Sequence, residues 1–387
     1  MKVLFTSEAV VEICKEKYFK TSFNPFIERY RYFGDVIFAS YKKEVTISKQ
    51  SVLNTEGVQF EFFEKENSLL GILKNWRRNR HHMRKCVERA DIIVAHLPSP
   101  IGMIAIKYAK MYRKPYIIGV VGCTWDACWN YNWKGKLVAA LFYISMRNAV
   151  KQAKYVFYVT QEFLQRRYPN NGITMGCSNV EIQQAPYNVL TKRLESIETL
   201  DFKSTINIVT VAAVNVRYKG QEYVIRALDT LNHRRGFNFH YHLIGGGDNS
   251  FLMNLTKKLN LEQYVHFIGP IPHEKIWYYL DNMDIYIQPS RQEGLPRALI
   301  EAMSRGLPAF GSRTAGIPEL LPEDCLFDNG SVKQITKLLS SLTINVMRRC
   351  ANANYEKSFE YTSDVLAKRR KSFFDKVISS IKQHGSH

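Results

Sequence analysis

The sequence predicts an α/β protein with two doubly wound, Rossmann-like domains that face each other across a cleft. Two observations carry this prediction. Short β-rich runs alternate with helical stretches, and the alternation stops at a polar segment and then restarts. The length of 387 residues and the hydrophobic content of 45% agree with two or three domains of an ordinary globular protein.

The first series of runs predicts an N-terminal domain over residues 1–190. Several strand candidates are apolar on both faces, which is typical of buried parallel strands. Helical stretches such as 75–90 and 100–114 lie between them. The strands are expected at 2–7, 35–40, 58–63, 91–96, 116–121 and 155–160.

The polar segment TKRLESIETLDFKS, residues 191–204, reads as a linker between domains. A second domain is expected over 205–360, followed at 361–387 by a C-terminal helix that packs back on the first domain. Ligands of doubly wound sheets bind beyond the carboxyl ends of the strands, so the cleft is the expected site. The second series has strands at 206–214, 239–245, 265–269, 284–290 and 307–312, with helices at 223–235, 250–260, 273–283 and 297–305.

The net charge of +19 indicates an anionic partner, with solubility alone as the alternative. Positive residues are concentrated in the stretch 73–86, where Trp76 lies among them. A solvated helix face, a nucleic-acid site and a membrane surface all fit this pattern. The cations of the stretch are Lys74, Arg77, Arg78, Arg80, Arg84 and Lys85.

The seven cysteines are scattered, without a CxxC pair or zinc-type spacing, so reduced thiols and no metal site are expected. The N-terminal stretch has no apolar segment of signal-peptide type. The longest apolar run, 137–146, is about half a membrane span. These features predict a cytoplasmic protein without a spanning helix, and leave a helix lying on a membrane as an alternative.

The stretch SRQEGLPRALIEAM, residues 290–303, places two acids around a predicted helix start. Pro296 suits the first helical position, and the free amides there favour an anion such as a diphosphate. Glu293, at the end of a strand, can face a sugar, while Glu301, in the helix, can accept hydrogen bonds from a ribose. The alternatives are a capping carboxylate for Glu293 and a solvent-facing helical residue for Glu301.

Two further loops follow strands of the second series. In AVNVRYKG, Arg217 and Lys219 can neutralise a diphosphate leaving group, and Gly220 lets the backbone turn. In HLIGGGDNS, residues 242–250, the glycines let the backbone approach a ligand. An exposed basic loop and a plain strand-to-helix turn are the respective alternatives.

The order of these motifs resembles the nucleotide-sugar half of glycosyltransferase family 4, whose members are retaining enzymes with the GT-B fold. The resemblance covers about residues 206–321. It implies that Glu293, Lys219 and Arg217 are catalytic, with Glu293 on the donor sugar and the two cations on the diphosphate. It also implies a substrate-binding set: Glu301 at the ribose, the loop and helix start Gly294, Leu295, Pro296, Arg297 and Ala298, the glycine loop Gly245 and Gly246, and Phe267 and Gly269 at the base.

The resemblance further implies transfer of a sugar from a nucleotide-diphosphate donor to a glycan or lipid-linked acceptor, in bacterial surface polysaccharide assembly. No cofactor or metal is expected, because side-chain cations replace it, and there is no Asp-x-Asp triplet. The expected location is cytoplasmic, with peripheral contact between 73–86 plus 125–146 and an anionic membrane, and no nucleic acid. A GT-B epimerase or phosphorylase and a non-catalytic nucleic-acid binder are the competing functions.

The sequence departs from the family pattern at several places. Ser7 and Glu8 follow the first strand where many relatives have two glycines, and Val214 stands where many have an arginine. Many relatives have a histidine after the strand at 116–121, but this chain has none there. His96 or Asp126 is therefore expected to serve the acceptor, with a buried polar role as the alternative for each.

Overall fold

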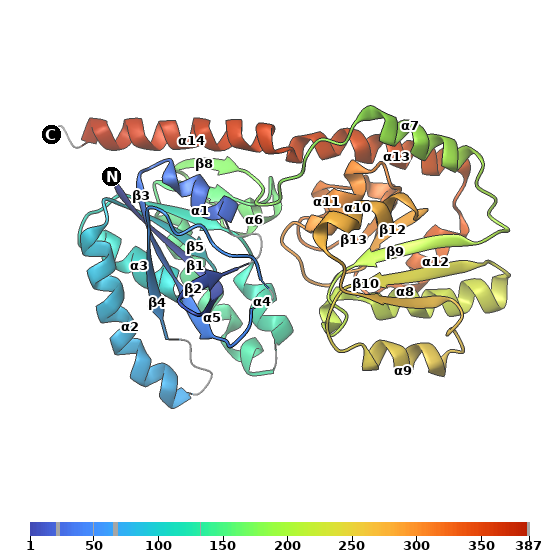
Figure 1. Ribbon diagram of the computed structural model, residues 1–387, viewed down its shortest axis with the longest axis horizontal. Helices are drawn as coiled ribbons and strands as arrows, with labels where there is room; N and C mark the ends of the chain where they lie inside the picture. Colours follow the sequence, from blue (N-terminus) through green and yellow to red (C-terminus); the bar gives the residue numbers. More distant parts are fainter. Residues whose placement is uncertain (21–23, 49, 65–68, 132, 385–387) are drawn as a thin grey trace. The chain divides into compact units, whose positions relative to one another are not determined.

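The computed structural model describes residues 1–20, 24–48, 50–64, 69–131 and 133–384 of the chain (Figure 1). They form two units. The first comprises Met1–Val159, Leu164–Gly176 and the C-terminal residues from Ser372, and the second comprises Thr160–Phe163 and Cys177–Lys371. No helix among these residues combines the length and apolarity that crossing a lipid bilayer requires.

The first unit is built on a sheet in the order β4-β3-β1-β5-β6-β7-β8, in which these strands are parallel. The short strand β2 pairs antiparallel with the carboxyl-terminal end of β1. All six residues of β5 are buried, as the apolar run at 92–95 predicts, and His96 is buried with them. The strands are β1 (Lys2–Cys14), β2 (Lys17–Phe19), β3 (Asp35–Glu44), β4 (Val58–Phe63), β5 (Ile92–Leu97), β6 (Tyr116–Val120), β7 (Tyr155–Tyr158) and β8 (Ile173–Gly176).

Helices cover both faces of this first sheet. On one face α2 and α3 bury Met83 and Ala105 against Leu4 and Ile93. On the other face, Tyr30 and the C-terminal residue Phe374 share a core with Phe38. The helices of the unit are α1 (Asn24–Arg31), α2 (Leu69–Arg89), α3 (Pro100–Met111), α4 (Thr124–Tyr131), α5 (Trp133–Lys151), α6 (Phe163–Arg167) and the end of α14 (Ser363–His384).

The second unit has a sheet in the order β11-β10-β9-β12-β13-β14, parallel throughout. Helices α7, α11 and α13 form one layer and α8 with α12 another (Figure 1). The strands are β9 (Ile206–Val211), β10 (Phe239–Ile244), β11 (Val265–Gly269), β12 (Ile285–Gln288), β13 (Ala309–Ser312) and β14 (Leu326–Phe327). The helices are α7 (Tyr187–Glu198), α8 (Gln221–Leu228), α9 (Ser250–Lys258), α10 (His273–Asp281), α11 (Arg297–Ser304), α12 (Val332–Ser340) and α13 (Ile344–Ser358).

The structure differs from the predicted linker over 191–204. Helix α7 occupies most of this segment and belongs to the second unit, which begins near Cys177 rather than after residue 190. The physical reason is that Ile197 is buried, as is Arg193, which donates to backbone carbonyls at the end of α10, among them that of Leu280 at 2.9 Å. A sequence of high polarity therefore forms a packed helix here.

Candidate functional site

The predicted residues of the second half gather at the carboxyl ends of β9, β10 and β12. Because all strands of this sheet are parallel, the loops that follow them open at the same edge. Three of these loops are tied together by backbone hydrogen bonds. The amide of Arg291 donates to the carbonyl of Tyr218 (2.7 Å), and the amide of Val214 donates to the carbonyl of Gly246 (3.1 Å).

Glu293 is held at this edge through one of its two carboxylate oxygens. Its Oε1 accepts hydrogen bonds from Lys219 Nζ at 2.6 Å, Ser290 Oγ at 2.7 Å and Gln288 Nε2 at 3.1 Å. Among the described residues, no donor lies on Oε2. The carboxylate is therefore fixed in direction, while one oxygen is left to accept a hydrogen bond from a ligand. The alternative of a helix-capping carboxylate is not what the structure has, since α11 has no side-chain cap.

Lys219 reaches Glu293 because the chain turns sharply behind it. Arg217–Lys219 form one turn of 3-10 helix, and Gly220 ends the turn with a φ of +75°. A Cβ at Gly220 would lie 2.0 Å from the carbonyl oxygen of Pro289, so only glycine fits. The close approach packs the loop after β9 against the end of β12, and so brings the lysine to the carboxylate.

Arg217 does not join this pair in the structure. Its guanidinium forms an ion pair with Glu222 (Nε to Oε2, 2.8 Å) and lies 3.6 Å from the centroid of the Phe251 ring. The guanidinium of this second predicted cation therefore lies against the start of α9 and not beside Glu293.

Glu301 lies in α11, which begins at Arg297 as predicted, although Pro296 is the extended N-cap residue and not the first helical residue. The prediction of a solvent-facing side chain, given as its alternative, is wrong, because Glu301 is only 3% exposed. One oxygen, Oε1, is 2.9 Å from His273 Nε2 and 3.8 Å from Arg297 Nη1. A nearly buried carboxylate thus faces a half-exposed histidine at the start of α10.

The loop before α11 and the glycine loop complete the edge. Gly294 accepts a hydrogen bond from the amide of Gly316 (3.0 Å), which orders the turn that leads through Leu295 and Pro296 to Ala298. Gly245 donates to the carbonyl of Gly269 (2.9 Å) and has a φ of +157°. The end of β11, where Phe267 is partly buried, is therefore joined to the glycine loop.

The two predicted acceptor residues of the first unit have separate surroundings. His96, at the end of β5, is 6% exposed, contacts Tyr30 Oη through Nε2 (2.7 Å), and lies among the rings of Phe5 and Phe157. Burial lowers the pKa of His96 to about 3, so the imidazole is neutral. Asp126, in the first turn of α4, lies 3.9 Å from Arg167. These contacts fit the buried polar role for His96.

Some residues of the candidate site were not predicted from the sequence. Gln288 and Ser290 hold Glu293, and Tyr286 Oη in turn donates to Gln288 Oε1 at 2.7 Å. His273 contacts Glu301. The only signal in the sequence is that Gln288, the last residue of β12, and Ser290, two residues later, are polar residues after the apolar run 285–287. Their partners become visible only in the fold.

A group of potential metal ligands lies elsewhere. Glu61 on β4 and His82 and Cys86 on α2 bring donor atoms within 4.8 Å of one another in the described part of the chain. Arg89 also pairs with Glu61 (2.7 Å), so the carboxylate is already neutralised. None of these residues is a predicted site residue.

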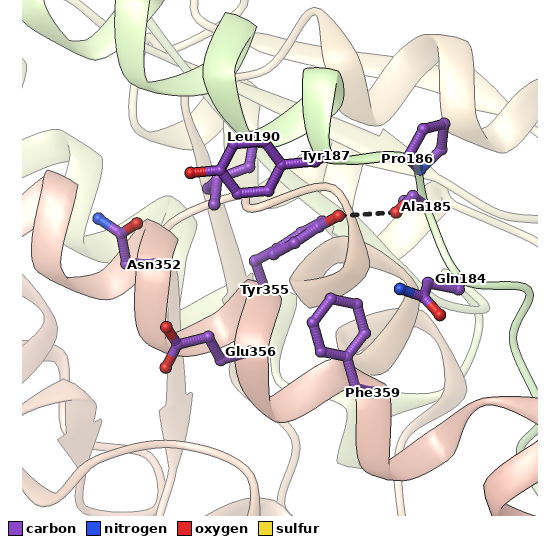
Figure 2. Close-up of a pocket in the computed structure, with 9 residues that line it drawn as sticks. All are labelled: Gln184, Ala185, Pro186, Tyr187, Leu190, Asn352, Tyr355, Glu356 and Phe359. Atoms are coloured by element: carbon purple, nitrogen blue, oxygen red, sulfur yellow. Dashed lines mark hydrogen bonds between the residues drawn. The ribbon is translucent and has the colours of Figure 1, made fainter.

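A pocket of about 560 Å³ in the second unit also lies away from the predicted residues (Figure 2). It is lined by α7, α13, the segment before α7, and Phe359, which directly follows α13. The rings of Tyr187 and Phe359 flank Tyr355, whose hydroxyl donates to the Ala185 carbonyl (2.7 Å). In α13, Asn354 donates to the carbonyl of Leu307, just before β13, so this region borders the amino end of that strand rather than the carboxyl edge.

Comparisons with known proteins agree with this architecture. The family model described as glycosyl transferases group 1 matches residues 192–357. Protein CapJ of Staphylococcus aureus is 30% identical over 363 residues, which cover 91% of this chain and 89% of CapJ. The amylovoran biosynthesis glycosyltransferase AmsK of Erwinia amylovora is 30% identical over 190 residues, covering 46% of each chain.

Solved structures with a similar fold cover nearly the whole chain. Sucrose-phosphate synthase from Thermosynechococcus elongatus has a TM-score of 0.71 at 14% identity, covering 98% of this chain and 99% of that one. HepE of Anabaena, solved in complex with UDP, has a TM-score of 0.67 at 15% identity, covering 98% and 100%. The fold is GT-B, and the chain belongs to the glycosyl transferases group 1 family, as a glycosyltransferase.

Proposed function

We propose that the protein is a retaining, metal-independent glycosyltransferase of family 4. It transfers a sugar from a nucleotide-diphosphate donor to a glycan or lipid-linked acceptor in bacterial surface polysaccharide synthesis. The pathway is supported by bacterial relatives described as biosynthetic glycosyltransferases for amylovoran and, putatively, for colanic acid. A nucleotide-sugar donor is supported by HepE, which was solved with UDP and with UDP-glucose.

One observation carries the proposal: the contact between Lys219 and Glu293 beside the start of α11. It places a cation, a carboxylate with a free oxygen and open helix amides at one edge of a sheet. A diphosphate attached to a sugar requires this combination, with positive charge for the phosphates and a hydrogen-bond acceptor for the hydroxyls.

The proposed roles follow from these positions. Lys219 neutralises the diphosphate together with the backbone N–H groups of Leu295, Arg297 and Ala298. Glu293 Oε2 accepts from a hydroxyl of the donor sugar, while Oε1 stays fixed by Ser290 and Gln288. Glu301 binds the ribose, and the backbone from Phe267 to Gly269 lies against the base.

In the proposed mechanism the acceptor hydroxyl attacks the anomeric carbon from the face that the nucleotide leaves, so the configuration is retained. The bond from the anomeric carbon to the phosphate oxygen breaks, and the phosphate takes the proton of the acceptor. Negative charge grows on the leaving diphosphate, where Lys219 is placed to stabilise it. Arg217 adds a second cation if it moves from Glu222.

Thermal-shift screening with UDP-, GDP- and ADP-sugars tests the proposal. A bound ligand at about 100 times its dissociation constant adds roughly 2.7 kcal/mol to the free energy of unfolding. We expect one nucleotide class to raise the melting temperature, and Glu301→Ala to reduce the rise by about half. Product analysis with and without an acceptor then separates transfer from epimerisation. If no class stabilises the protein and none yields product, the proposal fails.

We also propose a cytoplasmic location with peripheral contact to an anionic membrane. The net charge of +19 supports it, as do the exposed Trp76 and the guanidinium of Arg80, 4.3 Å from the centroid of that ring. The side chain of Lys74, part of the same stretch, lies outside the described residues. Flotation with anionic and with neutral vesicles tests the contact, and equal behaviour with both would argue against it.

A further inference from the structure

Helix α5 has an unusual distribution of side chains around its axis. One side is buried in the first unit through Ala139, Met146 and Val150. Another side is apolar but exposed: Leu137 and Leu141 are 72% and 70% exposed, and Val138, Phe142 and Ile144 continue the surface. Leu137, Leu141 and Ile144 are four and three residues apart, so they form one ridge along the helix. We call these five residues the α5 ridge.

The flank of the α5 ridge is basic. Lys136, Arg147 and Lys151 are exposed and occupy the sector of the helix between the ridge and the buried side. From Ile92 to Gln161, the sequence contains a single acidic residue, Asp126. The ridge therefore has cations beside it and almost no negative charge in the surrounding sequence.

A groove of about 640 Å³ between α3 and α5 supplies cations beyond the C-terminal end of the α5 ridge. Lys107 and Lys110 come from α3, and Ser145, Asn148 and Gln152 come from α5 or follow it. Lys110 Nζ donates to Gln152 Oε1 at 2.7 Å. Two lysines, two amides and a hydroxyl are the donors that a phosphate group requires. The remaining lining is apolar: Met103, Ile106, Met111 and Ala149.

We infer that the α5 ridge and the α3–α5 groove form the surface through which this protein lies on an anionic lipid bilayer. The ridge enters the headgroup region, and the groove takes a lipid phosphate. The inference rests on the membrane contact of the proposed function and identifies its location. A helix with an apolar face and basic flanks is the arrangement that lies in a membrane interface. Charge complementarity selects a bilayer over a protein partner, since protein interfaces are depleted in lysine.

Helix α2 contains the basic stretch 73–86 that the sequence predicts as a membrane contact, but its role in this arrangement differs from that of α5. Several of its cations are already paired: Arg84 with Glu88 (2.9 Å) and Arg89 with Glu61 (2.7 Å). Trp76 is its one large exposed apolar side chain among those described. Helix α2 therefore contributes electrostatic attraction, while α5 provides the apolar surface that a bilayer can bury.

Co-sedimentation of the full-length protein with vesicles tests the inference. The vesicles are phosphatidylcholine alone or mixed with phosphatidylglycerol. We expect Leu141→Glu to weaken binding to the mixed vesicles about tenfold, because a side chain that is buried in lipid becomes charged. The matched control is Ile47→Glu, an equally exposed apolar residue (81%) of the same unit, which should bind as the wild type does.

A second pair of variants separates the groove from the ridge. Lys107→Gln combined with Lys110→Gln should weaken binding to the mixed vesicles by about fivefold for each lysine and leave binding to neutral vesicles unchanged. The control, Lys257→Gln with Lys258→Gln, removes two exposed lysines from α9. All four variants should keep the melting-temperature rise with the donor nucleotide, so loss of docking is distinguishable from failure of the catalytic proposal.

Three results would overturn the inference. The first is absence of wild-type binding to the mixed vesicles. The second is equal binding by Leu141→Glu and wild type. The third is a dimer in light scattering that Leu141→Glu dissociates, because the α5 ridge would then belong to a second copy of the chain.

Discussion

The two sheets of this protein have the same layered construction but opposite chemistry at their carboxyl ends. At the end of β12, Glu293 and Lys219 form a charged pair that remains partly accessible. At the end of β5, His96 is buried and neutral among aromatic rings. Parallel strands bring side chains to one edge in both units. Whether the edge keeps charge depends on whether water or a ligand can still reach it.

The charged edge of the second unit and the neutral edge of the first unit each depend on particular neighbouring residues. The second unit holds its charges with a chain of polar contacts, from Tyr286 through Gln288 to Glu293. The first unit fills the corresponding space with Phe5 and Tyr30, whose centroids are 4.4 Å apart, and so excludes charge from His96. If the proposed roles hold, substitutions at the second edge change catalysis, whereas substitutions at the first change stability.

The largest effect is expected for Glu293→Ala. Loss of the carboxylate removes the acceptor for the donor sugar and leaves Lys219 without its partner. Turnover should fall on the order of a hundredfold or more, because the sugar is no longer oriented. The measurement is the rate of sugar transfer, with exposed Glu262→Ala as the control. Turnover equal to that of the wild type would remove Glu293 from the proposed mechanism.

The second-largest effect is expected for Lys219→Ala, in which kcat/KM should fall about tenfold or more. The variant loses a charge-assisted contact with the diphosphate, so both donor binding and departure of the nucleotide suffer. Steady-state kinetics with varied donor measure the effect, and exposed Lys333→Ala is the matched control. Wild-type donor affinity and rate in Lys219→Ala would reject the phosphate assignment.

Much of the fold could be predicted because buried parallel strands have a plain pattern. β5 is apolar except for His96 and is fully buried, and the expected bounds differ by one residue at each end. The prediction of a linker at 191–204 is wrong, because polarity alone cannot distinguish a linker from a helix that buries an arginine. Arg193 can be buried because backbone carbonyls at the end of α10 accept its hydrogen bonds. These carbonyls lie about 90 residues further along the chain.

The candidate site divides in the same way. The positions of Glu293, Lys219 and the helix start follow from local motifs, and the structure brings Glu293 and Lys219 within hydrogen-bond distance. The two residues that hold Glu293, Gln288 and Ser290, and the partner of Glu301, His273, depend on contacts that no spacing specifies. The sequence likewise does not specify that Glu222 is the ion-pair partner of Arg217.

A smaller effect is expected for Glu301→Ala. If Glu301 binds the ribose equally in the ground and transition states, donor affinity should weaken about tenfold while kcat at saturating donor stays nearly constant. His273→Ala should produce a smaller loss, because His273 only orients Glu301. Titration calorimetry with the stabilising nucleotide measures both. A fall in kcat without a change in affinity would place Glu301 in the chemical step instead.

The smallest effect concerns the first edge. Burial lowers the pKa of His96 to about 3, whereas the unfolded chain has a histidine pKa near 6.5. Below about pH 6.5 the unfolded state therefore binds a proton that the native state excludes, and the free energy of unfolding falls progressively as the pH drops towards 3.

Replacement of His96 by glutamine keeps a hydrogen-bond partner for Tyr30 but removes the titration. At pH 5.5 this should reduce the acid-induced loss of stability by about 1 kcal/mol relative to the wild type. Denaturant unfolding at pH 7 and pH 5.5 measures the difference, and exposed His81→Gln should lose as much stability as the wild type. An equal loss in His96→Gln would mean that water or an acceptor reaches the first edge, and the contrast between the two edges would then disappear.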